Sequence, residues 1–348
     1  MNRLRRVDCA GTGITRRRRG RGFQYLDDGR TVTDEETLER IRALVIPPAW
    51  KDVWICPFPM GHIQATGTDA AGRKQYRYHD RWRERRDAEK FDSMMEFARV
   101  LPLVRSRVDE DLARDDMSRD RVLGGAVRLL DRGFFRIGSE GYAEQNETYG
   151  LATIRKDHVT VREGAVTFKY DAKGGKPRVH QLIDEDVLAL VAALKRRRGG
   201  GPELLAYKRG SRWTDVKSAD INEYLKRASG GDFSAKDFRT WNATVLAALA
   251  LSVSSEMARG TKTARKRAIK RAIDEVAHYL GNTPAVCRAS YIDPRVFDRY
   301  DGGVTIAGVL PEMAAETGDW PRLNRSVEQA VLDLLEDDRD SYAVEKVA

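Results

Sequence analysis

The 348-residue sequence lacks the motifs on which several large classes of enzyme depend. It contains no GxxxxGK[ST] segment, so nothing in it indicates nucleotide hydrolysis. The segment GTGITR begins like a dinucleotide-binding loop, but Arg16 is too bulky for the close approach of a pyrophosphate. The acidic segment 108–116 lies in a helical pattern, which is more typical of a solvated helix face than of a metal cluster. We therefore expect neither a cofactor nor a metal, and any phosphate chemistry would take its positive charge from arginine and lysine.

Cysteine and long apolar runs are also scarce. Cys9, Cys56 and Cys287 are far apart and form no CxxC pair, so neither a disulfide framework nor a zinc site is indicated. The longest apolar run, residues 243–253, is shorter than the ~18 residues that a membrane span needs. The first 20 residues are charged and contain no apolar segment typical of a secretory signal. These features fit a cytoplasmic protein without a membrane partner.

The charge balance of the sequence is strongly basic. Lys and Arg outnumber Asp and Glu by 62 to 53, which gives a formal net charge of +9. The hydrophobic content of 41% is high enough for a folded core. Excess positive charge favours a polyanionic partner, most commonly nucleic acid, although a basic protein without such a partner can have the same composition.

The predicted secondary structure divides the chain into three parts. Residues 1–20 are rich in Arg and Gly and are expected to form a flexible basic tail. Residues 21–88 are predicted to form a β-rich N-terminal DNA-binding domain, with one helix that begins at a capping box between Thr33 and Glu36. Its strands are predicted in the segments VWICPF, HIQATGTD and KQYRYH.

Residues 89–348 are predicted to form a mostly α catalytic domain. Its helices are expected at 81–108, 118–135 (with Ser118 as the N-cap), 184–198, most of 214–291, and 325–338. Short strands are expected in the segments LATI, HVTV and AVTFKYDA. The fold class is therefore α+β, with a small β-rich domain followed by a larger, mostly α domain.

Two arginines stand in apolar surroundings, where an unpaired charge is costly. Arg136 follows an apolar helix in the segment FFRIGSEGY, and Arg239 lies early in the apolar helix that follows AKDF. A guanidinium can bind two oxygens of one phosphate. A structural ion pair, with Glu140 or with Asp237, would explain each arginine equally well.

Lys173 and Tyr291 are candidates for proton transfer and nucleophilic attack. Lys173 follows an alternating strand and precedes Gly174 and Gly175, which places it at a hairpin tip. A lysine at such a tip is usually only solvated, but an ammonium beside other cations loses its proton more readily and can act as an acid. Tyr291 ends a short helical stretch and is either a core aromatic or a nucleophile.

Basic, amide and aromatic side chains alternate in the segment 67–82. Basic groups bind phosphates, whereas Gln and Tyr can contact base edges or sugars. An ordinary exposed strand with cross-strand aromatic pairs would have the same pattern. The candidate DNA contacts in this segment are Arg73, Lys74, Gln75, Tyr76 and Tyr78.

Five segments, in this order, together resemble the type IB DNA topoisomerases of the bacterial and poxvirus branch over roughly residues 25–295. They are GHIQATGTDAAGRKQYRYH, FFRIGSEGYAEQNETYGLATIRKDHV, FKYDAKGGK, KDFRTWNAT and LGNTPAVCRASYI. The resemblance implies that Arg136, Lys173, Arg239 and Tyr291 are catalytic. Asn282 falls where viral and eukaryotic members have a histidine, so the resemblance implies a catalytic role for an amide there, unless Asn282 only caps the preceding helix.

The resemblance also implies a fold and an activity. The fold would be a clamp around duplex DNA, built as in type IB topoisomerases and tyrosine recombinases. The activity would be relaxation of supercoiled DNA through a 3′-phosphotyrosyl intermediate, without ATP or a metal, by a monomer associated with a bacterial nucleoid. Lys236 would add positive charge one helical turn before Arg239.

A tyrosine recombinase is the nearest alternative, but it typically has His-x-x-Arg where this chain has Lys236-x-x-Arg239. A non-catalytic basic DNA-binding protein is the second alternative.

Overall fold

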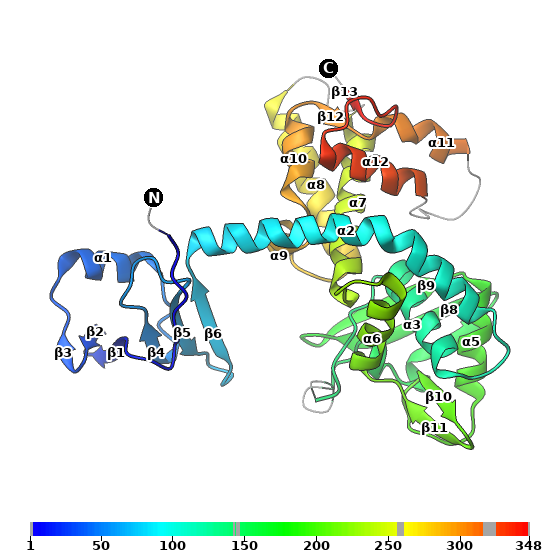
Figure 1. The fold of residues 1–348 in the computed structure, drawn as a ribbon, viewed down its shortest axis with the longest axis horizontal. Coiled ribbons are helices and arrows are strands. Elements are labelled where there is room, and N and C mark those ends of the chain that lie inside the picture. The colour runs from blue at the N-terminus through cyan, green and yellow to red at the C-terminus, as the bar shows by residue number, and fades with distance from the viewer. Residues whose placement is uncertain (1–2, 142, 144–146, 256–260, 316–324, 347–348) are drawn as a thin grey trace. The chain divides into compact units, whose positions relative to one another are not determined.

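The computed structural model describes residues 3–141, 143, 147–255, 261–315 and 325–346 (Figure 1). The chain forms two compact units, residues 1–91 and 92–348, and the boundary falls within the long helix α2 (Asp80–Leu112). The first unit is built around a sheet and the second is mostly helical, which confirms the α+β class. In the described part of the chain, no helix combines the length and the apolar character that a membrane crossing requires.

The first unit contains a six-stranded antiparallel sheet with the strand order β3-β2-β1-β4-β5-β6. Its strands are β1 (Ile14–Arg19), β2 (Gly22–Asp27), β3 (Arg30–Thr31), β4 (Lys51–Ile55), β5 (Ile63–Thr68) and β6 (Lys74–Tyr78). Helix α1 (Glu35–Ala43) contributes Ile41 to the core, which also contains Ile14, Val53 and Ile55. The last three strands correspond to the strands predicted between residues 53 and 79, which are confirmed.

The Arg-rich segment that was expected to be a flexible tail is instead part of this sheet. Strand β1 pairs with both β2 and β4, and Ile14 at its start is buried. The guanidinium of Arg16 donates to the carbonyls of Ile46, Pro47 and Trp50, and it stacks on the ring of Phe23. The prediction of a mobile tail was wrong because β1 forms a hairpin with β2 and is also bound by β4 and by carbonyl groups about thirty residues further along the chain.

The N-terminus of α1 differs from the predicted capping box. Asp34, not Thr33, is the N-cap, and its carboxylate accepts a hydrogen bond from the backbone N–H of Thr37 at 2.8 Å. Aspartate is at least as good an N-cap as threonine, and its negative charge also interacts favourably with the helix dipole. The helix therefore begins one residue later than the predicted box implies.

The second unit surrounds helix α7 (Ala235–Ser255) with other helices. After α2 these are α3 (Arg119–Gly133), α5 (Glu185–Arg196), α6 (Ser218–Ser229), α8 (Lys262–Leu280), α9 (Pro284–Ser290), α10 (Pro294–Asp301), α11 (Leu310–Ala315) and α12 (Arg325–Glu336). Ser118 caps α3 as predicted. Residues 256–260, within the predicted helical region, lie outside the described residues.

The sheets of the second unit are small. Strands β7 (Val159–Arg162), β8 (Ala165–Ala172) and β9 (Lys176–Leu182) form an antiparallel sheet, while β10 (Ala206–Arg209) pairs with β11 (Arg212–Asp215), and β12 (Val304–Thr305) with β13 (Glu345–Lys346). The strand predicted in LATI was wrong, because Leu151–Thr153 is a 3₁₀ turn. The third strand of the main sheet is β9, which was not among the predicted strands.

A buried ion network joins three helices to the start of α7. Arg105 on α2 binds Asp131 on α3 at 2.8 Å and Glu328 on α12 at 2.6 Å. The indole N–H of Trp241 on α7 donates to the same Glu328 carboxylate at 3.1 Å. The amide of Asn242 donates to the Asp131 carbonyl at 2.9 Å. These hydrogen bonds and ion pairs hold the first turns of α7 against α2, α3 and α12.

Candidate active site

Arg136 emerges from the turn that ends α3. Phe134 adopts left-handed backbone angles (φ 55°, ψ 24°) at the C-cap, and Phe135 then packs into the core. The half-buried Arg136 donates one hydrogen bond to the Gly281 carbonyl at 3.0 Å and another to Oδ1 of Asn282. Residues 145 positions apart in the sequence thus meet at this guanidinium.

Arg239 lies in the first turns of α7 and is 5% exposed. It donates to the carbonyl of Phe134 at 2.9 Å and to that of Leu280 at 3.0 Å. Its Cζ atom is 5.1 Å from the centroid of the Tyr291 ring. Burial lowers the pKa of Arg239, and the neighbouring Tyr291 side chain partly offsets this effect.

The two ion pairs that could have explained these arginines do not form in the described part of the chain. The Glu140 carboxylate instead accepts from the backbone N–H of Ser218 at 2.8 Å, at the start of α6. The Asp237 carboxylate accepts from the backbone N–H of Ser234 at 2.7 Å, at the start of α7. Both carboxylates stabilise helix N-termini. The donors of Arg136 and Arg239 bond to neutral oxygens, which a phosphate can replace.

Tyr291 is half-buried at the C-terminal end of the short helix α9. Its backbone N–H donates to the Cys287 carbonyl at 3.0 Å. The hydroxyl of Thr244, on α7, lies 3.4 Å from the Tyr291 carbonyl and accepts from the N–H of Asp293 at 3.1 Å. Tyr291 is therefore held against the helix that carries Arg239.

Asn282 follows the C-cap of α8. Gly281 has the left-handed φ of 63° that suits a glycine, and the backbone N–H of Asn282 donates to the Ala277 carbonyl at 3.1 Å. The helix is thus capped by backbone groups, while Oδ1 of Asn282 accepts from Arg136. The Nδ2 atom is buried and has no hydrogen-bond partner among the described residues. It is a donor of the kind that a phosphate oxygen would satisfy.

Lys173 lies at the tip of the hairpin between β8 and β9. Strand residues Ala172 and Lys176 are paired, and both Gly174 (φ 82°) and Gly175 (φ 66°) have left-handed φ angles that favour glycine. The Lys173 side chain is exposed. The hairpin predicted from the Lys-Gly-Gly segment is confirmed.

One pocket brings most of these side chains together. Its lining residues are Phe134, Arg136, Tyr170, Ala172, Lys173, Lys176, Arg178, His180, Arg239, Leu280 and Gly281. Five of them are arginine or lysine and, of the described residues that form it, none is acidic. Burial raises the pKa of Tyr170 to about 12 and lowers the pKa of His180 to about 4. Both are neutral at physiological pH, so the pocket carries only positive charge and suits an anion.

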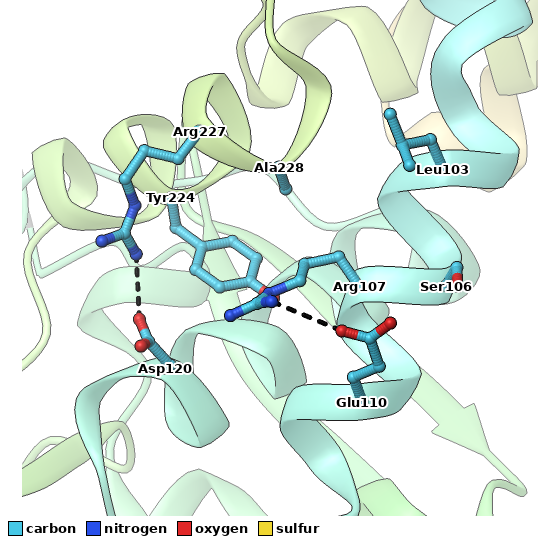
Figure 2. Close-up of a pocket in the computed structure, with 8 residues that line it drawn as sticks. All are labelled: Leu103, Ser106, Arg107, Glu110, Asp120, Tyr224, Arg227 and Ala228. Atoms are coloured by element: carbon cyan, nitrogen blue, oxygen red, sulfur yellow. Dashed lines mark hydrogen bonds and ion pairs between the residues drawn. The ribbon is translucent and has the colours of Figure 1, made fainter.

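A second pocket in the same unit has a different character. It lies between α2, α3 and α6, as Figure 2 shows, and its charged walls pair with each other. Arg227 binds Asp120 at 2.9 Å, and Arg107 binds Glu110 at 3.3 Å. Because these pairs neutralise the pocket, and because it contains no predicted catalytic residue, the cationic pocket is the candidate active site.

Comparison with known proteins agrees with a site that binds an anion. A family model described as the catalytic core of eukaryotic DNA topoisomerase I matches residues 79–319, and a model of the N-terminal domain of bacterial DNA topoisomerase IB matches residues 22–69. The chain belongs to the type IB DNA topoisomerases. It is therefore an isomerase that acts on DNA and relaxes supercoils.

Its relatives include viral and eukaryotic topoisomerases. DNA topoisomerase 1B of Acanthamoeba polyphaga mimivirus is 31% identical over 80% of this chain and 85% of its own length. DNA topoisomerase 1B of vaccinia virus (strain Copenhagen) is 22% identical over 67% of this chain and 70% of its own. DNA topoisomerase 1 of Mycosarcoma maydis is 23% identical over 61% of this chain, which spans only 23% of that longer protein.

The predicted DNA contacts of this topoisomerase lie on the edge strand β6 of the first unit. Lys74, Tyr76 and Tyr78 are exposed on one face, and the two tyrosine rings stack with centroids 6.0 Å apart. The other two are held differently: Arg73 and Gln75 bond to the carboxylate of Asp69 at 2.9–3.0 Å. The sixth predicted contact, Lys236 on α7, is exposed and does not line the cationic pocket.

Among the pocket residues that sequence reasoning missed are three from strand β9 of the topoisomerase, namely Lys176, Arg178 and His180. They lie on one face of β9, because they alternate along the strand. The signal was present in the segment KPRVH, where basic residues recur every second position after the glycine pair. It was overlooked because this segment was not predicted to be a strand.

In the part of the topoisomerase that the structure describes, no group of three or more His, Cys, Asp or Glu residues could hold a metal ion. The candidate site is instead assembled from cations, an amide and a phenol.

Proposed function

We propose that this topoisomerase relaxes duplex DNA by transient cleavage of one strand at Tyr291, without ATP and without an essential metal. The phenol of Tyr291 gives up its proton to solvent water, and its oxygen bonds to a backbone phosphorus as the bond to the 5′ oxygen breaks, which leaves a 3′-phosphotyrosyl link. The cut strand swivels, and the 5′ hydroxyl then attacks the phosphorus and releases Tyr291. One phosphodiester replaces another at each step, so no nucleotide hydrolysis is needed.

The single observation that carries this proposal is the convergence of Arg136, Arg239 and Lys173 on one pocket without an acidic lining residue in its described part, with Tyr291 against Arg239. Phosphoryl transfer develops charge on the equatorial oxygens, and preorganised guanidinium groups stabilise that charge in place of a metal. The arginines now bond to backbone carbonyls at 2.9–3.0 Å, a geometry that phosphate oxygens can take over.

Lys173 and Asn282 complete the proposed site. Lys173 donates a proton to the 5′ oxygen as it leaves, because an alkoxide is a poor leaving group, and it recovers that proton during religation. Asn282 donates from Nδ2 to a non-bridging oxygen. The buried, unpartnered Nδ2 supports this role, since a bound phosphate would satisfy it.

We assign the remaining contacts to DNA binding. The exposed Lys74, Tyr76 and Tyr78 would meet the duplex directly, and Arg73 and Gln75 would exchange Asp69 for DNA groups. Lys236 would contribute a phosphate contact near the site. One chain carries all five proposed catalytic residues, which supports action as a monomer, and the match to a bacterial N-terminal domain supports a role in the bacterial cytoplasm at the nucleoid.

The decisive experiment is plasmid relaxation by the purified protein in EDTA without ATP, on positively and on negatively supercoiled DNA. Both substrates should relax, and the covalent complex trapped with denaturant should carry DNA on the peptide containing Tyr291. Strict dependence on magnesium or ATP would contradict the proposal. Binding without relaxation would favour a non-catalytic DNA-binding protein, and strand exchange between two duplexes would favour a recombinase.

A further inference from the structure

Four consecutive carbonyls at the C-terminal end of α8 each accept a hydrogen bond from an arginine. Arg178 donates to His278 at 3.0 Å and also to Tyr279. The Leu280 and Gly281 carbonyls accept from the two arginines already described, each at 3.0 Å. A helix C-terminus is the negative end of the helix dipole, so it attracts these cations. Arg178 differs from the other two because it lies on the hairpin that carries Lys173.

We propose that Arg178 is a positioning residue for the transesterification: it ties the β8–β9 hairpin to the end of α8, so that Lys173 is held at a defined place relative to Asn282. This inference rests on the proposed function of the same site. It gives Arg178 a task distinct from that of Arg136 and Arg239, since it acts on the proton donor and not on the phosphate.

The position of Arg178 in the hairpin suits this task. It pairs with Tyr170 across the strands, two pairs away from the pair that closes the turn. Beyond it, Lys173 and the two glycines at the tip are exposed. The base of the hairpin rests on aromatic contacts, in which Tyr170 and His180 lie 6.2 Å and 4.6 Å from the Phe135 ring. Near the tip, the side chain of Arg178 forms hydrogen bonds that join the hairpin to α8.

The fit between Arg178 and α8 is close. A Cβ atom on Gly281 would lie 2.9 Å from Cζ and from Nη1 of Arg178, so any side chain there would push the guanidinium aside. Gly281 also needs its left-handed φ of 63° to end the helix. The same glycine therefore ends α8 and leaves room for the guanidinium that holds the hairpin.

If position 178 had only a structural role, an uncharged side chain would be expected there. Burial lowers the pKa of Arg178, and the neighbouring Arg136 adds to that effect. A half-buried cation beside other cations opposes folding unless it makes specific contacts, and an apolar side chain could cover the same surface at less cost.

The test is single-turnover cleavage of a duplex built on a cleavage site mapped on plasmid DNA, with either oxygen or sulfur at the bridging 5′ position. A thiolate leaves without protonation, so sulfur bypasses the proton donor. Arg178→Ala should slow cleavage of the oxygen substrate by roughly 10- to 100-fold, because a displacement of about 1 Å in a catalytic group has such an effect. The sulfur substrate should restore a rate within a few-fold of the wild-type enzyme.

Four further variants are compared with Arg178→Ala. Lys173→Ala should show the same rescue by sulfur, whereas Asn282→Ala should be slow on both substrates. Arg162→Ala removes an exposed arginine from the same sheet and should cleave both substrates at the wild-type rate. Arg178→Lys keeps the charge but cannot span two carbonyls, so it should show a smaller defect that sulfur also rescues. It replaces Arg178→Ala if that variant melts early.

The outcomes separate this inference from the proposed function. If Arg178→Ala cleaves the oxygen substrate at the wild-type rate, or is equally slow on both substrates while Lys173→Ala is rescued, Arg178 does not position Lys173 and only this inference fails. If Lys173→Ala is not rescued by sulfur, the assignment of the proton donor fails, and the inference about Arg178 fails with it.

Discussion

The guanidinium of Arg239 lies against the ring of Tyr291, with Cζ 5.1 Å from the ring centroid. The carbonyls of Phe134 and Leu280 hold that guanidinium, and Thr244 on the same helix holds the Tyr291 backbone. The proposed nucleophile and the most buried cation of the site are thus positioned together through α7. Because these groups are already in place, the reaction pays a smaller free-energy cost for orienting them.

Tyr291→Phe removes only the phenolic oxygen and keeps the ring that Arg239 contacts. We expect the variant to fold and to bind duplex DNA with wild-type affinity, but to form no covalent complex and to relax no plasmid. Tyr279→Phe is the matched control, because Tyr279 is nearby on α8 and packs on Phe134 with ring centroids 5.8 Å apart. It should relax DNA normally. Substantial relaxation by Tyr291→Phe would move the nucleophile to another residue.

Asn282→Ala should reduce the single-turnover cleavage rate by roughly 10²–10³, the effect of losing one oxyanion donor in a well-studied protease. The melting temperature should change little, because backbone groups of Gly281 and Asn282 make the helix cap. Asn282→His, which restores an N–H donor, should retain much of the activity. An alanine variant that cleaves at the wild-type rate but melts earlier would show that Asn282 is only structural.

The stability of the second unit should depend on pH through His180. Burial lowers its folded-state pKa to about 4, whereas an unfolded histidine titrates near 6.5. Below pH 6.5 the unfolded chain therefore takes up a proton that the folded chain does not, so the free energy of unfolding falls as the pH decreases toward 4. The contribution of this group is roughly 2 kcal/mol between pH 7 and pH 5. His180→Phe should remove that part of the pH dependence in urea unfolding. Identical pH profiles for both proteins would exclude a buried neutral His180.

Glu328→Ala should destabilise the second unit by roughly 3–5 kcal/mol, since it leaves Arg105 partly unpaired in a buried network and removes the partner of the Trp241 indole. Glu336→Ala is the control, because the pair between Glu336 and Arg99 is exposed and should contribute less than ~1 kcal/mol. Urea unfolding followed by hydrogen exchange on α7 and α12 measures both. Equal effects of the two substitutions would contradict a structural role for the network.

Local signals in the sequence were sufficient for several elements. Ser118 begins α3, the glycine pair after Lys173 closes a hairpin, and the strands of the first unit between residues 53 and 79 follow from alternation and turns. These features depend on capping, on left-handed glycine and on side-chain period, each of which acts within a few residues. The five proposed catalytic residues also follow from the sequence, through the resemblance of five short segments to one family.

Contacts between distant residues were decided only by the tertiary structure. Besides its hairpin with β2, strand β1 is bound by carbonyl groups about thirty residues away, although its composition is typical of a mobile tail. Glu140 was an equally plausible partner for Arg136 until the fold used it to cap α6, 78 residues further along the chain. Arg178 meets α8 across 100 residues of sequence. No local pattern encodes such pairs, because burial and hydrogen bonding select them only after the helices and strands have packed.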